Sequence, residues 1–280
     1  MHTINVENSI NSGQVFLWEK KDQFWYGING QDVLCVSKNG AISSYKNQKI
    51  DFFRKKDNFG LVLSSISNDK KVREAIKKFP GLRILRQDPF QCLISFIISA
   101  NNNITKIKNN LENMTKSYGK KVKYKNQEFF LFPKPKILAE LKINEIKDLG
   151  VGYRAEFIKK AAEMVVFKKI DFEFLKKTNY KEAKKIIIEI PGVGDKVADC
   201  VMLFSLDKLD ATPIDRWMIR ILQKYYVKKF LIETKSITPK QYNMLHEKIV
   251  NYFGEYAGYA QQFLFKMERE NYQKKWAVNP

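Results

Sequence analysis

The stretch Ile190–Lys196 has the sequence IPGVGDK, and Asp215 follows Lys196 by nineteen residues. Residues 181–190 carry apolar side chains at helical spacing, and Pro191-Gly192 ends that pattern. Residues 197–206 predict a second helix. Because glycine adopts backbone angles closed to other residues and has no side chain to obstruct a close approach, the turn between the helices leaves its amides accessible. The stretch therefore predicts a helical hairpin.

Such a hairpin offers unpaired N–H groups and the positive end of a helix dipole to an anion. On a nucleic acid, these groups hold a backbone phosphate and carry no sequence information. We expect the phosphate contacts at Gly192, Val193, Gly194 and Lys196. The predicted contact is to the phosphate backbone of the strand and not to a base.

Lys196 lies in the first turn of the second predicted helix, where the dipole favours the neutral, nucleophilic amine. At an unperturbed pKa of about 10.4, only about one lysine amine in 2,500 is neutral at pH 7, so desolvation must help. Val193, Val197 and Ala198 are the apolar neighbours that we expect to supply it. The structural alternative is a solvated surface lysine.

Asp215 precedes an apolar pattern at residues 218, 219 and 222, which predicts that it caps a third helix. A capping aspartate is usually structural. The joint occurrence of Lys196 and Asp215 around the Pro-Gly-Val-Gly turn instead favours an amine nucleophile with a carboxylate partner, as in DNA base excision.

These residues resemble a known family. Pro191–Cys200 and Thr212–Asp215 are similar to the catalytic segments of the helix-hairpin-helix DNA glycosylase superfamily, and within it of the 8-oxoguanine DNA glycosylases of the eukaryotic type. Gln87–Ile104 independently resembles the helix and asparagine turn of that family. Residues 12–16, 152–155 and 257–261 match further family segments in order, so the resemblance spans nearly the whole chain.

The resemblance implies a bifunctional enzyme that extrudes 8-oxoguanine from duplex DNA and excises it through a Schiff base on Lys196, with Asp215 as the catalytic carboxylate. The imine then allows β-elimination at the abasic site. Alkylbase glycosylases of the same superfamily use the aspartate without the lysine, so Lys196 is the position that indicates lyase activity.

A glycosylase must extract its target nucleotide from the base stack, and a protein side chain must fill the gap that the nucleotide leaves. We expect Tyr153 to be the wedge, and Asn101 with Arg154 to hold the opposite base. Lys106 stands where the family usually has an arginine for the opposite cytosine. Because lysine lacks the planar donor fork, strict cytosine preference is not expected. For Asn103 we favour a helix N-cap.

The resemblance also assigns the base pocket to residues far apart in the sequence. Phe265 supplies the aromatic face, Gln261 and the backbone of Gly13 contact the polar edge, and Cys200 lines the pocket. Two of these residues also have a purely structural interpretation. Phe265 lies on an apolar helix face typical of a core, and Cys200 suits a small packing residue.

Composition supports this interpretation without establishing it. Fifty Lys and Arg against 30 Asp and Glu give a charge of +20 and a pI near 9.6, which suits a polyanionic partner. A genome-wide codon bias towards lysine, asparagine and isoleucine produces the same excess. The three cysteines, Cys35, Cys92 and Cys200, are too few for a four-thiolate iron–sulfur cluster, so we expect no required cofactor and no metal. A structural cation at the hairpin is left open.

The pattern of the chain predicts an α+β protein. Short β-rich runs between residues 15 and 45, with Asn39-Gly40 as a hairpin turn, indicate an antiparallel β-sheet N-terminal domain over residues 1–80. Helical periodicity from Gln87 onward indicates an all-α helix-hairpin-helix domain over residues 81–280, with N-terminal residues helping to line the pocket. We expect the basic run Lys120–Lys125 to be a solvated loop.

We expect double-stranded DNA containing an oxidised purine as the partner, and a monomeric, soluble, cytoplasmic protein that acts at a prokaryotic nucleoid, without signal peptide or transmembrane segment. Three alternatives remain. The protein acts on another lesion, or it is a non-catalytic DNA-binding protein that uses the hairpin only for phosphate, or it is a basic helical protein whose Pro-Gly-Val-Gly is only a turn.

Overall fold

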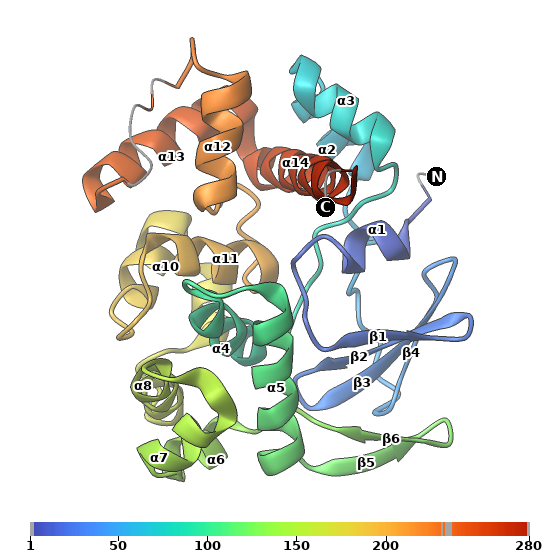
Figure 1. The fold of residues 1–280 in the computed structure, drawn as a ribbon, viewed down its shortest axis with the longest axis vertical. Coiled ribbons are helices and arrows are strands. Elements are labelled where there is room, and N and C mark those ends of the chain that lie inside the picture. The colour runs from blue at the N-terminus through green and yellow to red at the C-terminus, as the bar shows by residue number, and fades with distance from the viewer. Residues whose placement is uncertain (1–2, 231, 233–236, 279–280) are drawn as a thin grey trace.

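The computed structural model describes residues 3–230, 232 and 237–278. A sheet formed near the N-terminus lies beside a larger group of helices (Figure 1). The C-terminal helix α14 (Ala257–Val278) packs against helices of both the early and the late parts of the chain. This helix therefore joins the two ends of the sequence, as the predicted pocket requires.

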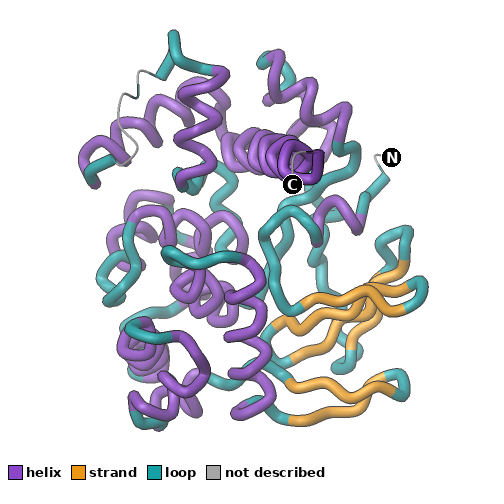
Figure 2. The backbone as a smooth tube through the Cα atoms, in the orientation of Figure 1, coloured by secondary structure: helices purple, strands orange, loops and turns teal. Residues whose placement is uncertain are grey.

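The sheet is an antiparallel meander. Its strands are β1 (Trp18–Lys21), β2 (Phe24–Asn29), β3 (Asp32–Ser37) and β4 (Ile42–Ser44), paired in chain order. The predicted hairpin at Asn39-Gly40 joins β3 to β4, because this pair of residues suits the tight turn that such strands need. The α+β prediction is confirmed. Figure 2 shows the strands confined to one side of the molecule.

Both faces of this sheet are covered. Tyr26 and Val33 face the main core, which they share with the helices, whereas Trp25 and Leu34 face a smaller core containing Phe52. Neighbouring residues of a strand point to opposite faces, so the alternation follows from strand geometry. A two-sided sheet with a shared core holds the N-terminal segment firmly against the helices.

Two helices follow the sheet, α2 (Phe59–Ile66) and α3 (Lys70–Lys78). Both pack against α14. Asn58 and Asp69 cap their N-termini by accepting backbone N–H groups, which satisfies donors that a helix start leaves open.

The helical periodicity after Gln87 corresponds to α4 (Pro89–Ser99) and α5 (Ile104–Tyr118). Asp88 accepts the N–H of Gln91 at 2.8 Å, with Pro89 in the first turn. Asn103 accepts the N–H of Lys106 at 2.9 Å. The prediction of Asn103 as an N-cap is therefore confirmed.

One local prediction is wrong. The basic run Lys120–Lys125 is not a loop, because β5 (Lys121–Tyr124) pairs antiparallel with β6 (Gln127–Phe130). The hairpin is held by tertiary packing, since Phe129 stacks on Tyr26 of the N-terminal sheet with ring centroids 5.6 Å apart. A charged run has no local signal for the contact between Phe129 and Tyr26, which lie more than a hundred residues apart in the sequence.

The remaining elements complete the helical part. No helix in the described ranges is long and apolar enough to cross a membrane. The remaining helices are α1 (Val6–Ile10), α6 (Pro135–Glu140), α7 (Ile143–Ile146), the π-helix η1 (Lys147–Val151), α8 (Arg154–Val166), α9 (Phe172–Lys177), α10 (Tyr180–Ile187), α11 (Asp195–Ser205), α12 (Arg216–Tyr225), α13 (Pro239–Phe253) and the 3₁₀ helix η2 (Gly254–Tyr256).

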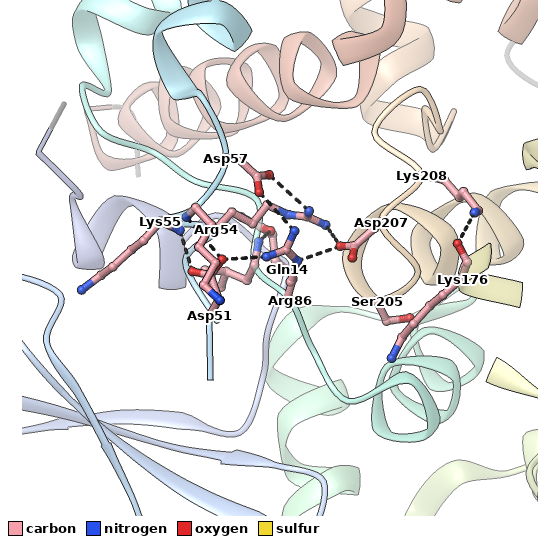
Figure 3. Close-up of polar contacts among 12 residues, drawn as sticks. Gln14, Asp51, Arg54, Lys55, Asp57, Arg86, Lys176, Ser205, Asp207 and Lys208 are labelled. Atoms are coloured by element: carbon pink, nitrogen blue, oxygen red, sulfur yellow. Dashed lines mark hydrogen bonds and ion pairs between the residues drawn. The ribbon is translucent and has the colours of Figure 1, made fainter. Parts of the chain in front are cut away.

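An ion-pair network ties the C-terminal end of α11 to the N-terminal part of the chain (Figure 3). Asp207 Oδ1 lies 2.6 Å from Arg54 Nη2 and 2.9 Å from Arg86 Nε. Arg86 also contacts Asp51 at 2.7 Å and Asp57 at 3.1 Å. Burial alone would raise the pKa of Asp207, but the two guanidinium groups outweigh it and lower that pKa. One end of the helix that carries Lys196 is thereby anchored.

Candidate active site

The predicted hairpin is formed by α10 and α11, although α10 ends at Ile187, three residues before the expected end. Gly192 has φ +81°, and a Cβ there would lie 2.3 Å from the ring of Phe157. Gly194 is different. Its φ of −94° is open to any residue, and a Cβ there would meet nothing within 4 Å. Gly192 is needed by the fold, whereas the space beside Gly194 is open.

The N-terminus of α11 lacks a side-chain cap. The neighbouring helices α4, α5 and α12 each have one, from Asp88, Asn103 and Asp215. The Asp195 carboxylate does not cover the amides of its own turn and instead pairs with Lys184 at 3.0 Å. Because first-turn N–H groups have no partner within a helix, those of α11 are available to an anion.

Lys196 is half-buried in the first turn of α11. Its Nζ donates to Ser99 Oγ at 3.1 Å and lies 5.2 Å from the centroid of the Phe96 ring. Phe96 in turn stacks on Phe204 at 5.5 Å. We expected the apolar neighbours on its own helix to desolvate the amine. The contacts around Nζ come from α4 and from Cys200, which follows one turn later on α11.

Asp215 caps α12 and accepts the N–H of Met218 at 2.8 Å. Burial raises the pKa of this carboxyl, and the charge of Lys196 opposes the rise. The two residues therefore act on each other electrostatically. The structure brings the predicted nucleophile and carboxylate into one site.

Asp199 was not predicted from the sequence as a functional residue. It is fully buried one turn after Lys196, and accepts hydrogen bonds from Tyr180 Oη at 2.7 Å and Tyr242 Oη at 2.6 Å. Burial raises its pKa to about 7, while Lys184 and the two hydroxyls act in the opposite direction. Its partners lie 19 and 43 residues away, so sequence spacing gave no signal of them.

The predicted pocket residues lie at the junction of both ends of the chain. A Cβ on Gly13, which has φ +82°, would lie 3.2 Å from Phe265 Cε1. Gln261 lies one turn earlier on α14. Its Nε2 points to the Pro213 carbonyl at 3.5 Å, and its buried Oε1 accepts no hydrogen bond from the described residues. Cys200 is buried, and burial raises the pKa of its thiol to about 12, so it presents a neutral surface.

The asparagine turn is held by Arg154. This buried guanidinium donates through Nε to the Ala100 carbonyl at 3.1 Å and through Nη1 to Val151 at 3.3 Å. Nη2 reaches the carbonyls of Ala100 and Asn101. Asn101 adopts φ +51°, a left-handed conformation that asparagine tolerates. Arg154 therefore shapes the backbone that presents Asn101, a role that spacing does not reveal.

Two further predicted contacts are exposed. Tyr153 is 57% exposed, packs edge-on against Phe157, and carries the Arg154 guanidinium 4.5 Å from its ring centroid. Lys106 is exposed in the first turn of α5, next to the asparagine turn. An exposed aromatic ring beside a rigid turn suits insertion into a base stack.

An uncapped hairpin helix, an amine and a carboxylate define a site for base excision from DNA. In agreement, residues 94–248 match the model of the HhH-GPD superfamily of base excision DNA repair proteins, and residues 1–93 match that of the 8-oxoguanine DNA glycosylase N-terminal domain. The chain belongs to the 8-oxoguanine DNA glycosylase family within this superfamily.

Individual relatives agree with this assignment. The chain is 31% identical over 277 residues to the N-glycosylase/DNA lyase OGG1 of Arabidopsis thaliana, covering 92% of this chain and 75% of that one. It is 27% identical to the probable N-glycosylase/DNA lyase of Methanothermobacter thermautotrophicus, with coverages of 72% and 68%.

Among solved structures, the 8-oxoguanine glycosylase/lyase of Clostridium acetobutylicum is 30% identical, with a TM-score of 0.85 and coverages of 97% and 93%. That structure is a complex with double-stranded DNA containing cytosine opposite 8-oxoguanine. The same fold thus holds damaged duplex DNA in a relative.

Proposed function

We propose that this protein excises 8-oxoguanine from duplex DNA and then cleaves the strand at the abasic site, using Lys196 as the nucleophile. The observation that carries the proposal is the half-buried Lys196 amine at the uncapped start of α11, close enough to the half-buried Asp215 for its charge to act on the pKa of that carboxyl. Phosphate binding alone requires neither side chain at these positions, which disfavours a non-catalytic DNA-binding protein.

The chemistry follows from these two groups. The neutral Lys196 amine attacks the sugar C1′, a C–N bond forms, and the bond between C1′ and the base breaks with its electron pair leaving on the base. Asp215 stabilises the positive charge that develops on the sugar. The aminal then opens, because the C1′–O4′ bond breaks with its electron pair leaving on O4′, which takes up a proton, while the nitrogen forms the C=N bond. This imine makes the C2′–H acidic, so loss of that proton and elimination of the 3′ phosphate cleave the strand.

The other site residues hold the DNA. The open amides at the start of α11 bind one backbone phosphate, and the space beside Gly194 admits it closely. The Val193 N–H is not among them, because it donates to the Ile190 carbonyl at 3.0 Å. Tyr153 fills the stack after extrusion, while Asn101 and Lys106 face the opposite base. The extruded base enters a pocket formed by Gly13, Cys200, Gln261 and Phe265.

We further propose that the protein acts as a monomer and requires no cofactor. Every group that the mechanism uses comes from one chain, and an amine with a carboxylate supplies the chemistry. The three cysteines of the sequence fall short of the four thiolates of an iron–sulfur cluster.

Borohydride trapping tests the proposal. Wild-type protein and Lys196→Gln are mixed with duplexes carrying 8-oxoguanine opposite each of the four bases, and with an undamaged duplex. A covalent adduct on the damaged duplexes that Lys196→Gln abolishes, with DNA binding retained, supports the lysine mechanism. Trapping by the variant at the wild-type level removes Lys196 from this role.

The same experiment separates the alternatives. If wild-type protein gives no adduct but binds duplex DNA in a salt-sensitive way, the protein acts on another lesion or is catalytically silent. The comparison of the four opposite bases reports on Lys106, for which we expect a preference less strict than one for cytosine alone.

A further inference from the structure

A hollow of about 240 Å³ lies where α1, the Gly13 loop, the start of α5 and α14 meet. Its volume far exceeds the roughly 30 Å³ that a water molecule occupies in the liquid. The aliphatic side chains of Ile10, Val15 and Ile104 line it, with Arg269 and Glu270 from α14. Because it includes Gly13, the hollow adjoins the candidate base pocket.

Arg269 occupies a distinctive position in this hollow. Gln261, Phe265 and Arg269 follow one another at intervals of four residues along one face of α14. The Nη1 atom of Arg269 lies 3.1 Å from the position that a Cβ on Gly13 would occupy, and Phe265 lies 3.2 Å from the same point. Gly13 thus borders both the ring and the guanidinium.

The guanidinium has no acceptor of its own among the described residues. It is half-buried, and this burial lowers its pKa. Arginine carries five N–H donors, and those of Arg269 are not among the fully buried polar atoms of the described residues, so a ligand can reach them. Arg154, by contrast, has its donors engaged by carbonyls. Arg269 therefore has donors available for a ligand.

The surroundings favour a neutral ligand over a phosphate. A phosphate would lose hydration against the aliphatic walls formed by Ile10, Val15 and Ile104, and would meet the Glu270 carboxylate. Lys266 also lines the hollow, but its amine already donates to a backbone carbonyl at 3.1 Å. A flat, uncharged base gains from the same walls and needs only an acceptor oxygen for the guanidinium. The hollow thus suits the edge of an extruded base.

Oxidation of guanine at C8 produces such an edge. Guanine presents N7 as an acceptor, whereas the oxidised base has an N7–H donor next to a new carbonyl oxygen on C8. Building on the function proposed above, we propose that Arg269 donates a hydrogen bond to the C8 carbonyl oxygen of the extruded base, and so distinguishes 8-oxoguanine from guanine. A residue with a neutral side chain at this position would read the lesion less strongly.

Equilibrium binding tests the assignment without requiring catalysis. Arg269→Met and Arg269→Lys are each made in the Lys196→Gln protein and titrated with three duplexes, which carry 8-oxoguanine, guanine or a tetrahydrofuran abasic analogue at one position. Arg73→Met, on the exposed face of α3, is the matched control for the loss of one positive charge. Circular dichroism melts establish that each variant is folded.

We expect Arg269→Met to weaken binding of the 8-oxoguanine duplex by about tenfold to a hundredfold, as for other hydrogen bonds to charged groups, and to change the other two by less than about twofold. Arg269→Lys keeps the charge without the donor fork and should lie between. Arg73→Met should not alter the preference for the lesion.

Two outcomes would overturn the proposal. An equal loss on all three duplexes, with a smaller dependence on salt, would show a backbone phosphate contact. Unchanged binding of the 8-oxoguanine duplex would show that the guanidinium meets no base. A different result would be that the Lys196→Gln protein itself shows no preference for 8-oxoguanine over guanine. That result would contradict the proposed substrate and not the role of Arg269 alone.

Discussion

The Tyr242 hydroxyl donates a hydrogen bond of 2.6 Å to Asp199 and accepts one of 3.0 Å from the backbone N–H of Ile214. Asp199 lies on the helix of Lys196, and Ile214 immediately precedes Asp215. A single hydroxyl group from α13 therefore connects the helix that carries Lys196, the proposed nucleophile, to the segment that carries Asp215, the proposed catalytic carboxylate. We expect the relative position of these two groups to depend on this link.

Tyr242→Phe should reduce the single-turnover excision rate by roughly tenfold or more, because small displacements of positioned groups are costly for catalysis. The free energy of unfolding should fall by about 1–3 kcal/mol, since the Ile214 N–H and one Asp199 oxygen lose a buried partner. Tyr252→Phe is the control, because Tyr252 makes a similar bond to Asp69 at 3.1 Å elsewhere. Equal slowing in both variants would contradict a positioning role.

The stability of the protein should also report the titration of Asp199. Burial raises its pKa from 3.8 to about 7 in the folded state. Between about pH 4 and about pH 7 the folded protein therefore holds a proton that the unfolded chain has released. The contribution of this carboxyl is fully present below that window and is lost as the pH rises through it.

Asp199→Asn removes this titration. The unfolding free energy of the variant, relative to wild type, should rise with pH by up to about 1.4 kcal/mol per unit across the window. Urea denaturation of both proteins at several pH values measures the difference. Parallel stability curves would show that Asp199 titrates as it does in the unfolded chain.

The two hairpin glycines should separate folding from DNA binding. Gly192→Ala should destabilise the protein, because its backbone is left-handed and the new methyl group would meet Phe157. Gly194→Ala should fold normally, since its φ is ordinary and the space beside it is empty. It should nevertheless weaken duplex binding by about tenfold, because the methyl group obstructs a phosphate. Thermal melts measure the stability of the two variants, and titrations with duplex DNA measure their binding. Normal binding by Gly194→Ala would show that the phosphate does not bind beside Gly194.

Asp215→Asn tests catalysis apart from capping. Asparagine caps a helix as well as aspartate does, so the melting temperature should change little. Excision should fall by about a hundredfold to a thousandfold, as when other groups that stabilise transition-state charge are removed. Single-turnover rates equal to wild type would leave Asp215 as a structural cap.

Asp207→Ala should lower the free energy of unfolding by about 1–2 kcal/mol, because the buried Arg54 loses its shorter ion pair of 2.6 Å. The loss is moderated because Asp207 is 43% exposed and Arg54 keeps Asp57 at 3.4 Å. Combining Asp207→Ala with Arg54→Met should recover part of the loss, since the buried charge that was left with only its longer ion pair is then absent as well. Urea denaturation of the single and double variants measures this, and purely additive losses would show that the pair is uncoupled.

The features that the sequence predicts well are those set by local chemistry. The caps at Asn103 and Asp215 and the turn at Asn39-Gly40 depend on neighbouring residues, and each lies where its pattern indicates. Element types followed from periodicity for the same reason. The resemblance added residues such as Gly13 and Phe265, which the fold brings into contact.

Features that depend on distant partners could not be predicted in this way. Ser99 approaches Lys196 across 97 residues, and Tyr242 approaches Asp199 across 43. The β5–β6 hairpin was missed because its stabilising contact comes from another sheet. The hydrogen bonds from Arg154 to the asparagine turn could not be predicted either. In the sequence, an arginine next to Tyr153 indicates a ligand contact and gives no sign of binding to backbone carbonyl groups.

The buried cysteines have a consequence for survival under oxidative stress. Peroxides attack the thiolate form of cysteine, and burial raises the pKa of Cys200 to about 12 and that of Cys92 well above its ordinary value. Both thiols therefore stay protonated and shielded at cellular pH. The oxidants that generate 8-oxoguanine therefore react slowly with these two sulfur atoms. Oxidative damage to the genome can increase while both thiols remain reduced.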